Sequence, residues 1–274
     1  MTKRPFLFWL GFALLVGFAG VAILAPLLAP YDPLQPLALP LSAPSQDHLL
    51  GTNDLGQDIL SQMVYGTRST LIVAISVTAI STALSWIVGL AAGFIPRLEG
   101  LLMGLTDLLL ALPELPLILL VLTLIDATRI TLILVLGLLS WPVFARLVRS
   151  IVIGVRASPY VEASKALGAS GARIMARHLL PATLDVLPAK LVLTVRYAVF
   201  AESTLAFLGV GGSDTVSLGS MLKIAFSDPL LFSRPVWPWL VLSPAIAIAA
   251  LILATVWAGS GLSGNRMRKH GQNW

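Results

Sequence analysis

The chain contains 274 residues, of which 57% are hydrophobic and 11% are charged, and its formal net charge is +5. Soluble domains carry about 25% charged residues, so the composition excludes a single water-soluble core and predicts a protein that lies in lipid. The absence of cysteine excludes disulfides, thiolate metal ligands and a cysteine nucleophile, and the basic residues flank apolar segments without interleaved aromatics, which excludes a nucleic-acid-binding surface.

The first 29 residues predict a transmembrane helix. Lys3 and Arg4 precede an apolar run over residues 6–29 that is interrupted only by Pro26. The alternative is a cleaved signal peptide. The apolar core of a signal peptide spans about 7–15 residues, whereas this run is long enough to cross a bilayer.

Crossing a bilayer takes about 20 apolar residues, because only a helix satisfies its own backbone in hydrocarbon. Six segments meet this requirement: residues 6–29, 69–95, 101–125, 130–155, 183–210 and 237–262. The sequence therefore predicts an all-α, polytopic membrane protein with six transmembrane helices. Residues 69–262 are the predicted five-helix core, and residues 263–274 are a terminal tail.

The distribution of Lys and Arg predicts the orientation. With six spans, most of the 18 Lys and Arg residues fall on the side of the N-terminus, whereas the other side holds Arg68, Arg129, Lys223 and Arg234. Basic residues are enriched on the cytoplasmic side of membrane proteins. We therefore expect both termini in the cytoplasm and a multi-pass location in the inner membrane.

Residues 30–68 form the predicted outer loop. Its first half is proline-rich and should be extended, and its second half places apolar residues at helical spacing over residues 58–65, which predicts a short amphipathic helix on the membrane face. The spacing of Asn53, Asp54 and Asp58 fits turn and cap chemistry and does not fit an EF-hand metal loop. The segment 211–235 is a second predicted outer connection.

Residues 158–181 predict a helical hairpin on the cytoplasmic side. Ser158 can cap a helix that begins at Pro159, and Gly168 can end that helix in a left-handed conformation. Ser170 can cap a second helix over residues 171–179, which Pro181 should stop. A charged hairpin between two apolar spans is a natural docking surface.

The hairpin resembles the EAA loop of ABC-importer permeases in the order Glu162-Ala163-Ser164, Gly168 and His178-Leu179-Leu180-Pro181. Residues 51–61 and 65–68 resemble the outer-loop signature of the peptide and nickel subgroup. The similarity is greatest to the second permease subunit of dipeptide, oligopeptide and nickel importers, and it implies the type I importer architecture. Ser164 and Ala182 depart from the usual pattern of the hairpin, and Gln57 and Gln62 from that of the outer loop.

This resemblance implies a transport mechanism with several partners. Two permease chains form the pathway, two ATPase subunits bind ATP and Mg and push the hairpins, and an extracytoplasmic substrate-binding protein delivers the solute. The present chain contains no G-x-x-x-x-G-K-[ST] sequence, so we expect a non-catalytic subunit without a cofactor of its own. The ATPase-coupling residues implied by the resemblance are Glu162, Ala163, Ser164, Gly168, Ala169, Arg173, His178 and Pro181. A simple solvent-exposed pair of Glu162 with Lys165 is the alternative for the first of them.

Five charged residues fall inside predicted spans: Asp107, Glu114, Lys190, Arg196 and Glu202. Charges in the membrane cost at least about 2.5–3.5 kcal/mol and normally face a cavity or each other. One hypothesis is that Lys190 and Arg196 line the translocation path and favour an anionic solute. The alternative is internal pairing with Glu202, Glu114 or the partner permease.

Two other functions remain open from the sequence. A stand-alone secondary transporter could use Asp107, Glu114 and Glu202 as ion or proton sites, although no paired repeats or broken helices are apparent. A structural subunit of a membrane complex would have no need of a docking hairpin. The sequence does not distinguish between dipeptide, oligopeptide, nickel and metal-chelate solutes.

Overall fold

The computed structural model describes residues 6–211 and 215–263, and this part of the chain folds into helices without a β-strand. The predicted all-α fold is confirmed. The α-helices are α1 (Phe6–Ile23), α2 (Ala25–Leu28), α3 (Ile59–Phe94), α4 (Pro96–Ala111), α5 (Glu114–Leu124), α6 (Arg129–Leu139), α7 (Pro142–Arg156), α8 (Pro159–Ala166), α9 (Gly171–Ile174), α10 (Leu180–Leu184), α11 (Leu187–Phe207), α12 (Leu218–Phe226) and α13 (Ser243–Ser263). Lys3, Arg4 and nearly all of the predicted tail, residues 263–274, lie outside the described residues.

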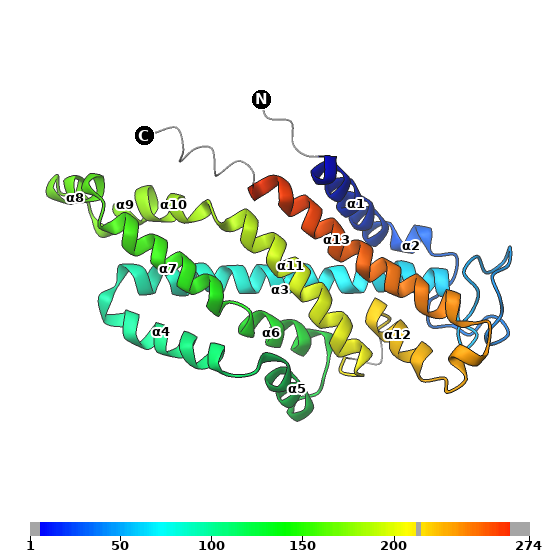
Figure 1. The fold of residues 1–274 in the computed structure, drawn as a ribbon. Coiled ribbons are helices and arrows are strands. Elements are labelled where there is room, and N and C mark those ends of the chain that lie inside the picture. The colour runs from blue at the N-terminus through cyan, green and yellow to red at the C-terminus, as the bar shows by residue number, and fades with distance from the viewer. Residues whose placement is uncertain (1–5, 212–214, 264–274) are drawn as a thin grey trace.

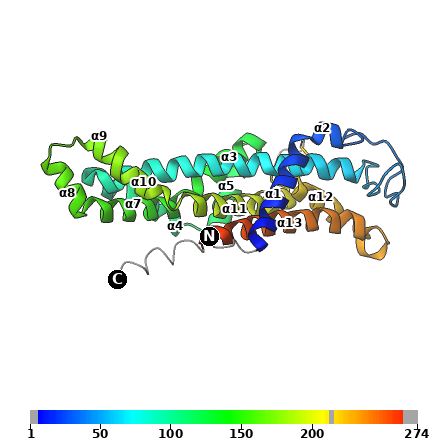
Figure 2. The ribbon, with the colours of Figure 1, turned by 90° about the horizontal axis from the view of Figure 1, so that it is seen from above.

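Helix α3 is the longest helix described and runs along the length of the molecule (Figure 1). Its 36 residues extend over roughly 54 Å at 1.5 Å per residue. In both views, α8 and α9 lie at one end of the molecule and the segment between α2 and α3 lies at the other (Figures 1 and 2). A buried apolar cluster joins α3, α6, α11 and α13 through Val77, Leu136, Leu205 and Leu251. The two predicted functional regions are thus at opposite ends of one long helix.

The prediction of six membrane spans is not confirmed. Among the described residues, four helical segments are long and apolar enough to cross a bilayer: Phe6–Ile23, Ile59–Phe94, Arg129–Arg156 and Pro238–Ser260. A fifth exists if the bent pair α4 and α5 counts as one span. Helix α11 has 21 residues and covers most of the predicted span 183–210. It is not among the four apolar segments, because it contains the charged residues Lys190, Arg196 and Glu202.

The predicted span 101–125 is broken. Helices α4 and α5 meet at an angle of 93° around Leu112 and Pro113. Proline has no N–H group and disfavours helical geometry in the residue before it, which explains the end of α4. A second interruption separates α6 from α7 at Ser140 and Trp141, directly before Pro142. The expectation that this chain contains no broken helices was therefore wrong.

The predicted separate helix over residues 58–65 is instead the first part of α3. Asp58 caps this helix by accepting a hydrogen bond from the Ser61 N–H at 2.8 Å. No proline follows until Pro96, so the helical backbone continues without a proline break from Ile59 to Phe94. The proline-rich half of the outer segment, residues 30–57, is irregular, as expected.

The second outer connection contains a helix that was not predicted from the sequence. Helix α12 begins after Ser217, whose hydroxyl accepts from the Ser220 N–H, and the Ser220 hydroxyl lies 2.9 Å from the Ser217 N–H. This reciprocal arrangement is a capping box in which serine replaces the usual Glu or Gln. The sequence signal was present, but the glycines before it favoured an interpretation as a loop.

Candidate functional site

The hairpin, defined as residues 158–181, is fixed to the ends of α3 and α7 by an apolar cluster. Trp86 of α3 and Val152 of α7 pack against three buried hairpin side chains, those of Val161, Ile174 and Leu179. The Trp86 Nε1–H donates to the Thr183 hydroxyl oxygen at 3.0 Å. Since buried aliphatic and aromatic groups stabilise by about 1.5–3 kcal/mol each, the hairpin is a rigid extension of the helix bundle.

The turn between α8 and α9 has the predicted left-handed glycine. Gly168 has φ of +81°, and the Ala169 N–H donates to the Ser164 carbonyl at 3.0 Å while the Gly168 N–H donates to the Lys165 carbonyl at 2.9 Å. These two bonds are the Schellman motif that ends many helices. Ser170 caps α9 as predicted, by accepting from the Arg173 N–H.

Two local predictions for the hairpin were wrong. The Ser158 side chain does not cap α8, because its hydroxyl donates to the Val155 carbonyl at 2.5 Å instead. Pro181 does not stop the second helix, which continues through a π-helical turn at Met175–Leu179 into α10. The wider π turn accommodates a residue that lacks an N–H and whose ring would clash with an α-helical carbonyl.

The outward surface of the hairpin carries both charged and apolar side chains. Glu162, Ala163, Gly168 and Arg173 are exposed, and Leu167 at the tip is 89% exposed. Of the other predicted coupling residues, Ser164, Ala169 and His178 are half-buried and Pro181 is exposed. Glu162 makes no ion pair with Lys165 or with any other described residue. The carboxylate in the first turn of α8 is therefore available to a partner.

Lys190 is a buried structural cation. Its side chain is 1% exposed, and its ammonium donates to the Ser81 hydroxyl at 2.6 Å and to the Ser140 carbonyl at 3.3 Å. The ammonium also lies 4.7 Å from the centre of the Phe144 ring. Lys190 thus binds a carbonyl freed by the break between α6 and α7, and within the described ranges it pairs with no carboxylate.

Arg196 and Asp107 lie at the surface of the chain. Arg196 is exposed on α11 beside Leu193 and Phe200, and it has no ion pair among the described residues. Asp107 of α4 pairs with Arg146 of α7. A parallel contact joins Glu99 to Arg149, also between α4 and α7. The Asp107–Arg146 pair is exposed and the Glu99–Arg149 pair is half-buried. Neither pair was anticipated, because the partners are far apart in sequence.

The α4–α5 break and the α6–α7 break both line one cavity of about 270 Å³. Its lining includes Ser140 at the second break, the exposed residue Glu114 and the half-buried Tyr197. The Tyr197 hydroxyl donates to the Glu114 carboxylate. In hydrocarbon, non-helical backbone and charges occur only where they are buried in protein or line water. This surface is consequently suited to an aqueous passage.

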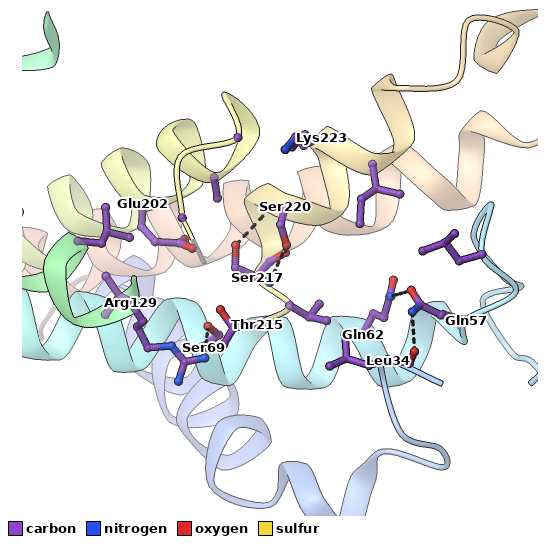
Figure 3. A pocket seen from close by; sticks show the side chains of 18 residues that line it. Leu34, Gln57, Gln62, Ser69, Arg129, Glu202, Thr215, Ser217, Ser220 and Lys223 are labelled. Atoms are coloured by element: carbon purple, nitrogen blue, oxygen red, sulfur yellow. Dashed lines mark hydrogen bonds between the residues drawn. The ribbon is translucent and has the colours of Figure 1, made fainter. Parts of the chain in front are cut away.

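Glu202 lies in a different cavity, at the end of the bundle opposite the hairpin, which is the predicted outer end and gives this outer cavity its name (Figure 1). The cavity has a volume of about 360 Å³ and is enclosed by α3, α11, α12 and the outer segment (Figure 3). Glu202 is 2% exposed, and its carboxylate accepts from the Thr70 hydroxyl at 2.9 Å. Arg129 and Lys223 line the same space, although from the sequence both served only to predict orientation. A single sequence gives no sign that residues so far apart along the chain lie close together in space.

The chain is similar to known transport proteins. Residues 81–264 match the family described as "Binding-protein-dependent transport system inner membrane component". A protein named "Putative peptide permease protein" of Brucella suis is 33% identical over 255 residues, which are 92% of this chain and 83% of that protein. The dipeptide transport system permease protein DppC of Haemophilus influenzae is 32% identical over 269 residues, 95% of this chain and 89% of that protein.

Proposed function

This chain belongs to the family of binding-protein-dependent transport system inner membrane components, and we propose that it forms part of a peptide-conducting pathway driven by ATPase subunits that dock on the hairpin. The family consists of non-catalytic permease components of ABC transport systems, so the energy for transport comes from other chains. We propose that the hairpin faces the cytoplasm, where ATP is available. A second permease chain and a substrate-binding protein complete the proposed complex.

The observation that supports docking is the contrast between the two sides of α8. Val161 is fully buried against α3 and α7, whereas Glu162, Ala163 and Leu167 are exposed, and Glu162 forms no ion pair with a described residue. A rigidly anchored helix transmits a force applied to its outer face to the helices below it. Rigid-body movement of packed helices is a common form of switching in transport proteins.

Replacing Glu162 by alanine is expected to weaken association with the ATPase subunits at least about tenfold. A hydrogen bond to a charged group contributes about 1.5–3 kcal/mol, and its loss removes that contribution from docking. The measurement is co-purification of the ATPase subunits with a tagged permease complex in detergent, combined with ATP-driven peptide uptake into vesicles. Both should decrease together.

Lys165→Ala is the matched control, because this residue lies on the same short helix and forms no ion pair with Glu162. Near-normal association and uptake are expected for it. Equal effects of the two substitutions would indicate a general loss of helix α8 and not a docking contact. Uptake without any ATPase subunit would identify a stand-alone carrier.

We propose that the translocation path follows the surface formed by the α4–α5 elbow and α11. Glu114 and Arg196 lie on this surface, whereas Lys190 is buried behind it. The support is physical: an exposed carboxylate, an exposed guanidinium and irregular backbone in one membrane region would be unfavourable against lipid. A second permease facing this surface would enclose an aqueous pathway.

Leu193→Cys tests this path, because the natural chain has no cysteine and each variant therefore carries a single thiol. In the assembled complex, Leu193→Cys is expected to react with a water-soluble maleimide at least about fivefold faster than Ile75→Cys, since only thiols in contact with water ionise readily. Ile75 is an exposed residue on α3, and it does not line the cavity that Leu193 lines together with Glu114 and Tyr197. Equal protection of both thiols would place α11 against lipid or protein instead.

The proposed solute is a short peptide, since the similar proteins are named as peptide or dipeptide permeases. Nickel and metal chelates are the other solutes expected from the resemblance. A competition assay with the complete importer distinguishes them: unlabelled dipeptide should suppress uptake of labelled dipeptide, and nickel salts should not.

A further inference from the structure

The cavity of about 270 Å³ at the α4–α5 break, which we call the elbow cavity, is lined by one acidic side chain and by no basic one among the described residues. Glu114 lines it from the start of α5 and Tyr197 lines it from α11, while leucines and other apolar side chains form most of the remaining wall. None of the ion pairs among the described residues includes Glu114. Its carboxylate therefore has no Lys or Arg partner within ion-pair distance in this part of the chain.

The local structure supports a negative charge at Glu114 and leaves it able to bind a further group. Glu114 is the first residue of α5, and the N-terminus of a helix favours a negative charge. The Tyr197 hydroxyl donates to one carboxylate oxygen, Oε1. A carboxylate can accept several hydrogen bonds on its two oxygens. Glu114 can thus accept hydrogen bonds from a cationic ligand while it keeps the bond from Tyr197.

Two aromatic rings, those of Phe144 and Tyr197, also line the elbow cavity. Ammonium groups are attracted to the faces of aromatic rings, and the Lys190 ammonium already lies 4.7 Å from the centre of the Phe144 ring. Lys190 itself binds Ser81 and the Ser140 carbonyl and is not among the residues that line this cavity. A carboxylate beside aromatic rings is a combination that suits an ammonium group.

The size of the elbow cavity fits one end of a solute. Its volume of about 270 Å³ lies just below the range of about 300–1,000 Å³ that is usual for sites that hold a whole small molecule. A negative charge in the wall repels a carboxylate and attracts a cation. The end of a peptide that this cavity can accept is consequently the one that carries an ammonium group.

We propose that the elbow cavity binds the ammonium group of a passing solute against Glu114, with the rings of Phe144 and Tyr197 beside it. This inference rests on the proposed function, which assigns this surface to the solute path, and it adds the charge of the group that is recognised there. The preference is opposite to the anionic one that the sequence suggested from Lys190 and Arg196. A peptide can supply the ammonium group from its N-terminus or from a lysine side chain.

The test compares two thiol reagents of opposite charge at Leu193→Cys in the purified importer complex, since Leu193 lines the elbow cavity. The reagents are the trimethylammonium-ethyl and the sulfonato-ethyl methanethiosulfonates, and each rate is divided by the rate with a free thiol in solution. The cationic reagent is expected to be favoured at least about fivefold, because Glu114 attracts it and repels the other. The ratio of the two rates does not depend on how far the thiol is ionised.

Competing peptides test binding of the ammonium group itself. Dialanine amide carries an ammonium group and no carboxylate, and in excess it should lower the preference for the cationic reagent at least about threefold, because it occupies the same carboxylate. Neutral N-acetyl-dialanine amide should leave the preference unchanged. N-acetyl-lysine amide shows whether a side-chain ammonium group is bound as well as an N-terminal one.

Glu114→Gln, combined with Leu193→Cys, should abolish both the preference for the cationic reagent and the effect of dialanine amide. Asp126→Asn is the matched control, because Asp126 is an exposed acidic residue just after the end of α5 that does not line the elbow cavity. It should keep the preference of the complex that carries Leu193→Cys alone.

Equal relative rates of the two reagents at Leu193→Cys overturn the inference, and this comparison needs no change at Glu114. A cationic preference that survives Glu114→Gln, or that the neutral peptide lowers as much as the cationic one, overturns it too. A thiol that reacts with neither reagent contradicts the proposed path and this inference with it. ATP-driven dialanine uptake with the binding protein is measured in parallel: uptake without a charge preference at the thiol removes this inference alone, whereas absence of uptake by the natural complex contradicts the proposed function.

Discussion

Replacing Gly168 by valine is expected to lower ATP-driven uptake at least about fivefold while the chain remains in the membrane. Gly168 has φ of +81°, a conformation that costs an L-residue about 1–2 kcal/mol and is least compatible with β-branched side chains. A free-energy difference of this size changes a two-state population by about 5–30-fold. The hairpin would then leave the geometry in which α8 presents Glu162.

The loss of uptake in Gly168→Val should come from the left-handed backbone conformation at this position and not from the size of the valine side chain. Apart from the chain neighbours, no described atom lies within 4 Å of the position that a Cβ of residue 168 would occupy, so the added Cβ meets no obstacle. Gly168→Asn is therefore the informative control, because asparagine tolerates the left-handed region and should retain most of the uptake. The measurements are uptake into vesicles and co-purification of ATPase subunits. Equal uptake by the valine and asparagine variants would contradict a conformational role for Gly168.

The hairpin could be predicted from the sequence because its structure is determined locally. Gly168 and Ser170 act through backbone groups within a few residues of themselves, and such contacts leave a readable pattern. The environment of Lys190 could not be predicted, because its partners Ser81 and Ser140 lie far away in sequence. The same reason applies to the charges that line the outer cavity.

The sequence also contained a packing signal that was not recognised. Gly89 and Gly93 of α3 are four residues apart and lie on one side of the helix. Small residues at this spacing allow two membrane helices to approach closely. In the structure, Gly89 lies against Val148 of α7 and Gly93 lies against Val152 of the same helix.

Replacing Gly89 by valine is expected to reduce the amount of folded complex and its uptake more strongly than Gly168→Val does. A Cβ at residue 89 would lie 2.7 Å from the Val148 Cβ and 2.8 Å from the Ala145 carbonyl oxygen. The carbonyl belongs to the backbone of α7, so α7 itself must move. Overpacking of this kind costs about 1–3 kcal/mol, and the added side-chain atoms of valine increase it.

Gly154→Val is the matched control, because Gly154 lies on α7 itself and a Cβ there has no neighbour within 4 Å. It should assemble and transport normally, while Gly89→Val should lower the thermal midpoint of the complex and the yield of co-purified ATPase subunits. The comparison matters because α7 leads directly into the hairpin, whereas α3 reaches the outer cavity through Thr70. If Gly89→Val assembled normally with full uptake, close α3–α7 contact would not be the link between ATPase docking and the outer cavity.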